Sequence, residues 1–128
     1  MHKARDDRRA LGAEGEARAA AHLKRRGYRI VERNVRAGGV EIDIVAARGR
    51  LIVFAEVKTR RSDTFGPPEQ AVDAAKQARI ARGAAAWLRG PGGRRARVER
   101  VRFDVIACLA APDGSWQIEH WEGAFDGN

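Results

Sequence analysis

Two acidic residues and one lysine, placed on two neighbouring hydrophobic segments, are the residues of this sequence best suited to catalysis. Asp43 lies in the segment 40–46, and Glu56 and Lys58 lie in the segment 51–59. Two carboxylates, together with a backbone carbonyl and water, suit a hard cation such as Mg²⁺ or Mn²⁺. A nearby lysine can orient or deprotonate water and offset the charge that grows on a phosphate. The three residues therefore predict a metal-dependent site for phosphodiester hydrolysis.

This chemistry requires the two segments to be adjacent strands. Segment 40–46 alternates, with Val40, Ile42 and Ile44 on one face and Glu41 and Asp43 on the other. Segment 51–59 is apolar on both faces, which favours a central strand covered on both sides. The Arg48-Gly49 pair marks a hairpin turn between them, so Asp43 is expected close to opposite Glu56. Glu56 and Lys58 are two residues apart and leave the same face of their strand.

A purely structural explanation of Glu56 and Lys58 stays open. Charged groups on an apolar strand must be compensated or used, and a buried Glu–Lys ion pair would compensate them. An outer sheet face open to solvent would also accommodate them. The pattern Asp…Glu-x-Lys is short and also occurs by chance.

The other expected elements surround these strands with helices. We expect a frayed N-terminus over 1–8, a helix over about 9–26, a strand over 28–35, and a second helix from Pro67 to about Leu88. A flexible loop over 90–93 and strands over 98–109 and 115–121 follow. The order α-β-β-β-α-β-β predicts an α/β fold with a mixed central β-sheet flanked by helices. Residues 9–125 then form a single domain.

The chain is strongly basic. Its 128 residues carry a formal net charge of +8, which favours a polyanionic partner such as nucleic acid, although an arginine-rich solvated surface is an alternative explanation. Arginines cluster between residues 89 and 102, and we single out Arg94 and Arg95 as nucleic-acid contacts. Arg60 and Arg61 directly follow the site lysine and are also expected to contact phosphate.

The cysteine content and the absence of long apolar stretches indicate where in the cell the protein is located. The single cysteine, Cys108, allows no intramolecular disulfide and is expected in the core. The N-terminus does not resemble a signal peptide and no stretch is apolar enough to span a bilayer, so we expect a cytoplasmic protein without a membrane partner.

Arg102 and Asp104 are expected to form a structural ion pair, and the three tryptophans to pack in the core and sheet. The scattered histidines make a zinc site improbable.

Short motifs distributed over residues 12–125 carry a family resemblance. They occupy residues 12–17, 26–28, 41–44, 53–60, 65–66, 76, 79, 102–105 and 123–125. The chain thereby resembles the YraN-like family of small bacterial predicted endonucleases, within the PD-(D/E)XK (restriction endonuclease-like) superfamily that also contains the archaeal Holliday-junction resolvases. Val40 and Ala55 depart from the pattern, because a glycine and a valine are expected there.

The resemblance implies a restriction endonuclease-like fold and a DNA endonuclease, with branched or junction DNA as one candidate substrate. It implies that Glu16, in the first helix, completes the metal coordination of Asp43 and Glu56. It also implies that Gln70 and Lys76 of the second helix support the lysine or contact phosphate. For all three helix residues an ordinary solvated helix face is the alternative. A homodimer is implied as well, because junction resolvases cut two strands symmetrically.

Two other classes of function remain open. A non-catalytic nucleic-acid-binding module would keep the fold without a productive metal site. A scaffold protein would bind another protein, and its basic charge would be incidental. Metal-dependent cleavage separates the enzyme from the binding module, and salt-sensitive nucleic-acid binding separates the binding module from the scaffold.

Overall fold

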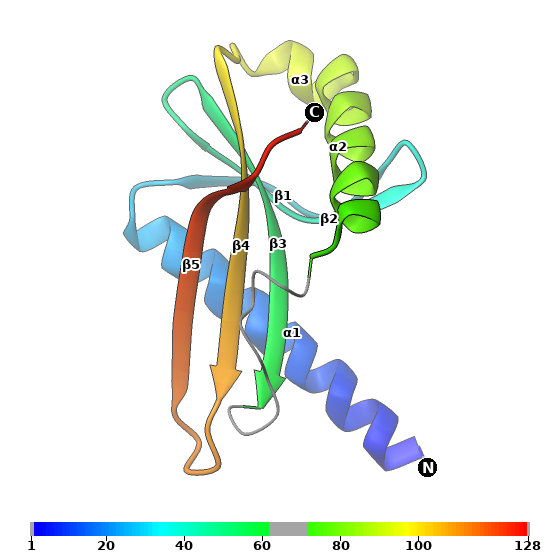
Figure 1. Cartoon of the computed structure of the whole chain (residues 1–128). Helices are drawn as coiled ribbons and strands as arrows, with labels where there is room; N and C mark the ends of the chain where they lie inside the picture. Colours follow the sequence, from blue (N-terminus) through cyan, green and yellow to red (C-terminus); the bar gives the residue numbers. More distant parts are fainter. Residues whose placement is uncertain (1, 62–71, 128) are drawn as a thin grey trace.

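Five strands form one mixed sheet with helices on both faces in the computed structural model, which describes residues 2–61 and 72–127 (Figure 1). The elements in chain order are α1 (His2–Arg25), β1 (Arg29–Ala37), β2 (Val40–Arg48), β3 (Leu51–Arg61), α2 (Ala74–Arg89), α3 (Pro91–Arg95), β4 (Arg100–Ala110) and β5 (Trp116–Phe125). The strands lie side by side in sequence order, and only the β3–β4 pair is parallel. The predicted α/β class is confirmed, and the order of elements is consistent with a restriction endonuclease-like fold.

The sheet separates two hydrophobic cores. One core packs α1 against the sheet through Ala19 and Leu23, which meet Val53 of β3. The other packs α2 against the opposite face through Ile80 and Trp87, and it includes Phe54 of β3. The prediction that β3 is central and covered on both faces is confirmed, because its first six residues are all buried.

The strand β2 does not keep the single apolar face that its alternation predicts. Ile44 packs in the α1 core, whereas Ile42 packs in the α2 core. Strict alternation would have placed these two residues, two apart, on one face. The change of side occurs around Asp43, where β2 ceases to pair with β3.

The strands differ from those expected by a few residues at their ends, with β5 extending to Phe125 instead of residue 121, and three helical regions differ more. The first helix begins at His2 rather than near residue 9, so residues 2–8, which were expected to be frayed, are helical. Most of these additional residues are good helix formers. The second helix begins at Ala74, where Asp73 accepts a hydrogen bond from the Lys76 amide as its N-cap. The expected start at Pro67 lies outside the described residues. The expected loop at 90–93 is part of a short helix, α3, with Pro91 at its start.

Gly15 allows α1 to lie unusually close to β3. A Cβ at this position would lie 2.0 Å from Oγ1 of Thr59 and within 2.9 Å of its Cβ, so rotating the threonine would not relieve the overlap. The carbonyl of Gly15 also accepts a hydrogen bond from the Cys108 thiol at 3.2 Å. Since Thr59 follows Lys58, this contact fixes the helix against the strand that carries the candidate catalytic residues.

A buried charge network joins β4 to β5 and α1. Arg102 donates two hydrogen bonds to Asp104, each 2.8 Å long, and the fully buried Asp104 also contacts His120 at 2.7 Å. Burial alone would raise the pKa of Asp104, but hydrogen bonds from His120, Arg102 and the Gly123 amide hold it below its ordinary value. The predicted structural ion pair between Arg102 and Asp104 is confirmed.

Substituting Gly15 should therefore cost stability, and Gly12 offers a matched control in the same helix. Gly15→Ala should lower the free energy of unfolding by about 1–3 kcal/mol, the usual cost of overpacking. Gly12→Ala should raise it by roughly 0.5–1 kcal/mol, because a Cβ there meets no atom within 4 Å and alanine favours the helix. Urea denaturation of both variants measures the difference. Equal effects of the two substitutions would contradict the close packing at Gly15.

Candidate functional site

The candidate site lies where β2 and β3 separate. These two strands pair only between Ile44↔Ala55 and Arg48↔Leu51. Beyond that point β2 continues along β1 as far as Val40, while β3 continues along β4 as far as Arg61. The sheet is thus forked, and the next residues in register on either side of the fork are Asp43 and Glu56. Their predicted proximity follows from this register.

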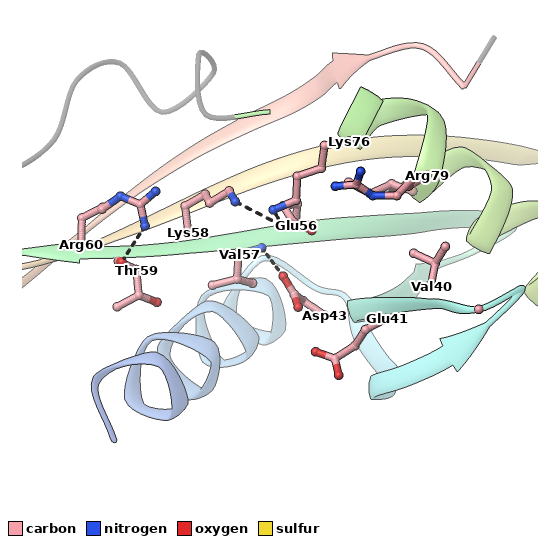
Figure 2. Close-up of a pocket in the computed structure, with 12 residues that line it drawn as sticks. Val40, Glu41, Asp43, Glu56, Val57, Lys58, Thr59, Arg60, Lys76 and Arg79 are labelled. Carbon is pink, nitrogen blue, oxygen red and sulfur yellow. Dashed lines mark hydrogen bonds and ion pairs between the residues drawn. The ribbon is translucent and has the colours of Figure 1, made fainter. Parts of the chain in front are cut away.

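A cleft of about 470 Å³ opens in the fork, closed on one side by the start of α2 (Figure 2). Among the residues that the structure describes, four basic and three acidic side chains line it. The basic ones are Lys58, Arg60, Lys76 and Arg79, and the acidic ones are Glu41, Asp43 and Glu56. The three predicted catalytic residues, Asp43, Glu56 and Lys58, therefore all line this one cleft. Such a concentration of charge beside two hydrophobic cores is costly unless the charges compensate one another or bind a ligand.

Glu56 sits between two lysines. Its Oε1 lies 2.7 Å from Nζ of Lys76 and 3.5 Å from Nζ of Lys58. Lys76 is in the first turn of α2, where the helix dipole disfavours a positive charge, and the glutamate compensates for this. The expected Glu–Lys ion pair is therefore present, with Lys76 as the nearer partner.

The two lysines differ in how tightly they hold their protons. Burial and the neighbouring Lys76 lower the pKa of Lys58, although Glu56 opposes the shift. Burial would also lower the pKa of Lys76, but its contact with Glu56 outweighs this and raises that pKa above the ordinary value. Of the two lysines, Lys76 therefore keeps its proton more firmly, and Lys58 loses its proton more readily.

Asp43 is held at the edge of β3 by one backbone hydrogen bond. Its Oδ2 accepts from the amide of Val57 at 2.8 Å, in place of the strand partner that β2 no longer supplies (Figure 2). Burial and the charge of Glu56 raise the pKa of Asp43 to about 7, although the hydrogen bond from Val57 opposes them. In the described residues Asp43 has no basic partner comparable to that of Glu56. Its negative charge is therefore less well compensated than that of Glu56.

The donor set fits a divalent cation that keeps much of its water. Asp43 and Glu56 supply hard carboxylate oxygens, and a cation between them would remove the repulsion that raises the pKa of Asp43. No group of three or more acidic, histidine or cysteine side chains converges on a metal position in the part of the chain that is described. Glu16 is near enough to raise the pKa of Asp43 slightly but does not line the cleft, so the predicted three-carboxylate ligand set is not assembled. Mg²⁺ is commonly held by only one or two carboxylates, with the substrate phosphate and water completing the shell.

The predicted nucleic-acid contacts fall in two places. Arg60 and Lys76 line the cleft, and Arg61 follows at the exposed end of β3. Arg94 and Arg95 are exposed on α3, at the opposite end of α2. Gln70 lies outside the described residues. None of the described helices is long and apolar enough to cross a membrane.

Two features of the structure had no role assigned to them from the sequence, although Arg79 was among the residues that carry the family resemblance. Arg79 lines the cleft because it lies three residues after Lys76 on α2, a spacing that places both on one helix face. His22 and His120, which are distant in sequence, contact each other at 3.1 Å and extend the network of Asp104. The helical spacing could have identified Arg79, whereas no local signal pairs the histidines.

Comparison with known proteins identifies a family. A model of the family described as uncharacterised protein family UPF0102 matches residues 15–108. A UPF0102 protein of Anaeromyxobacter dehalogenans is 44% identical, over 96% of this chain and 89% of its own. UPF0102 proteins of Rhodococcus jostii and Trichlorobacter lovleyi are 47% and 48% identical, over 91% of this chain in both cases and over 96% and 91% of their own lengths. The similarity therefore covers nearly the whole domain.

Removing the charge of Asp43 should stabilise the metal-free protein at high pH. The pKa of this carboxyl rises from 3.8 to about 7 in the folded protein, so ionisation opposes folding increasingly as pH rises through that interval. Asp43→Asn removes the charge and keeps an oxygen for the Val57 amide. Its free energy of unfolding should match the wild type near pH 4 and exceed it at pH 8. The gain should be at most about 4 kcal/mol, since one pKa unit corresponds to about 1.4 kcal/mol.

Chemical denaturation at the two pH values, with a chelator present, checks this prediction. Glu41→Gln is the control, because Glu41 is exposed on the same strand and contributes least to the shift of Asp43. A gain for Asp43→Asn that is equal at both pH values would contradict the raised pKa.

Proposed function

The chain belongs to the UPF0102 family, and we propose that it is a metal-dependent endonuclease of the PD-(D/E)XK superfamily that hydrolyses phosphodiester bonds in DNA. The observation that carries the proposal is the poorly compensated Asp43 beside Glu56 and Lys58 in a basic cleft. Two carboxylates and a lysine with a lowered pKa supply the groups that hydrolysis of a phosphodiester requires. DNA as the substrate, and branched or junction DNA in particular, follows from the resemblance to nucleases of this superfamily.

Asp43 and Glu56 would hold Mg²⁺ or Mn²⁺, which when bound polarises a phosphoryl oxygen and makes water more acidic. Lys58 would orient the attacking water and accept its proton, because burial and the neighbouring Lys76 lower its pKa below the ordinary value. Once protonated, the same ammonium offsets the negative charge that develops on the phosphate. Arg60 and Arg79 at the rim of the cleft supply further positive charge for the nucleic-acid backbone.

A non-catalytic nucleic-acid-binding module is the second candidate, and one contact favours it. The ammonium of Lys76 lies 2.7 Å from Glu56 and already provides this carboxylate with a cation. If that ion pair persists in the presence of Mg²⁺ or Mn²⁺, the cleft keeps its basic character without binding a metal. The homodimer expected from the resemblance stays a prediction under either candidate.

Metal binding and cleavage separate the two candidates. Millimolar Mn²⁺ should raise the melting temperature of the wild type, because a ligand that binds only the folded state stabilises it by mass action. Asp43→Ala and Glu56→Ala should abolish this rise. Lys58→Ala should retain it, since the substitution removes a positive charge near the cation, yet should lower cleavage by on the order of 10²-fold or more.

Linear, nicked, flap and four-way-junction DNA are the substrates for the cleavage assay. Arg9→Ala is the matched control, because it removes one positive charge from an exposed position on α1 and should cleave like the wild type. A wild-type melting temperature that does not respond to Mn²⁺, together with no cleavage of any substrate, would reject the enzyme and favour the binding module.

A further inference from the structure

A second, smaller hollow lies at the other end of β3, away from the cleft. It has a volume of about 120 Å³ and lies between the β2–β3 turn and the segment that follows α3. Four of its lining residues are arginines, namely Arg29, Arg50, Arg95 and Arg97, and no acidic residue lines it within 2–61 and 72–127. Pockets that enclose drug-sized ligands begin at about 300 Å³, so this hollow suits a small anionic group.

The backbone that carries two of these arginines is anchored. Ala96 and Val98 are partly buried against the α2 core, whereas Arg95 and Arg97, which alternate with them, are exposed. The amides of Glu99 and Arg100 both donate to the carbonyl of Arg50, at 2.9 and 3.2 Å. This fixes the segment after α3 to the β2–β3 turn, so the arginines are presented from a rigid frame.

The positive charge of the hollow is largely uncompensated. Arg50 pairs with Glu99. For Arg29, Arg95 and Arg97, the described residues supply no carboxylate within ion-pair distance. Guanidinium groups donate in a planar fork that matches the oxygens of a phosphate. An oxyanion in the hollow would relieve their mutual repulsion.

We propose that this hollow, formed by Arg29, Arg50, Arg95 and Arg97, is a phosphate-binding site for the nucleic-acid backbone, separate from the cleft. Ile52 of the hollow and Lys58 of the cleft both lie on the sheet face that α2 covers. They are six residues apart on β3, and a strand rises about 3.3 Å per residue, so the two sites are about 20 Å apart. That distance corresponds to about six base pairs of duplex. The site therefore binds DNA on one side of the phosphodiester held in the cleft. That the occupant is the nucleic-acid backbone rests on the proposed function, whereas the binding of a phosphate in the hollow does not.

Binding in the absence of divalent metal tests the site independently of cleavage. The double variant Arg95→Ala/Arg97→Ala is compared with Arg8→Ala/Arg9→Ala, which removes the same charge from exposed positions on α1, a different element. The affinity for duplex DNA is measured at several salt concentrations. The first variant should flatten the plot of log affinity against log salt by roughly 0.9 for each phosphate that it no longer neutralises, and the control should keep the wild-type slope. Unchanged circular dichroism and melting temperature establish that both variants are folded.

Equal slopes for the two double variants, or no binding of DNA by the wild type, would overturn the site. A titration with inorganic phosphate, followed by the NMR signals of the arginine side chains, distinguishes a free anion from the backbone. Saturation by phosphate alone with unchanged DNA slopes would assign the hollow to a free oxyanion and reject the nucleic-acid site. Flattened slopes without any DNA cleavage would reject the enzyme and leave this site standing. Cleavage of DNA together with equal slopes for the two double variants would support the enzyme and reject this site.

Discussion

The hydrogen bond from the Val57 amide to Asp43 is the interaction on which the arrangement of the site depends. At this point β2 stops pairing with β3, and the carboxylate takes the place of a backbone partner at the strand edge. The strands then diverge, each held by its other neighbour, β1 for β2 and β4 for β3. A fully paired sheet would have filled this space with backbone hydrogen bonds, so the cleft depends on the end of the pairing beside Asp43.

The two carboxylates at the fork, Asp43 and Glu56, differ in how well neighbouring groups compensate their negative charge. This difference suggests what the cleft binds. Glu56 has two lysines within ion-pair distance, whereas Asp43 has an amide and a neighbouring negative charge. A charged group that is removed from water is costly unless its partners compensate it, so a poorly compensated carboxylate is a cost that folding alone does not explain. A divalent cation shared by the two carboxylates would remove that cost. It would also compete with Lys76 for Glu56, which makes Lys76 the residue most affected by metal binding.

Much of the fold and the central part of the site could be predicted from the sequence. Local signals predicted the β2–β3 hairpin, namely the apolar segment around Phe54 and the turn at Gly49. The two-residue spacing of Glu56 and Lys58 predicted that both side chains leave the same face of β3. The fork could not be predicted, because alternation in β2 gives no sign that Ile42 and Ile44 belong to different cores. The ion pair of Lys76 with Glu56 and the contact of His22 with His120 depend on how helices pack on the sheet, which no short motif encodes.

The position of a bound metal would show directly whether Asp43 and Glu56 share one cation. Crystals grown with Mn²⁺ and measured at the manganese absorption edge would locate the ion by its anomalous scattering. If Asp43 and Glu56 share one cation, a single strong peak will lie in the cleft within coordination distance of carboxylate oxygens of both residues, and the Lys76 ammonium will be displaced from Glu56. Density that leaves Lys76 on Glu56, without a manganese peak beside Asp43, would contradict the shared cation and identify the cluster as a structural ion network.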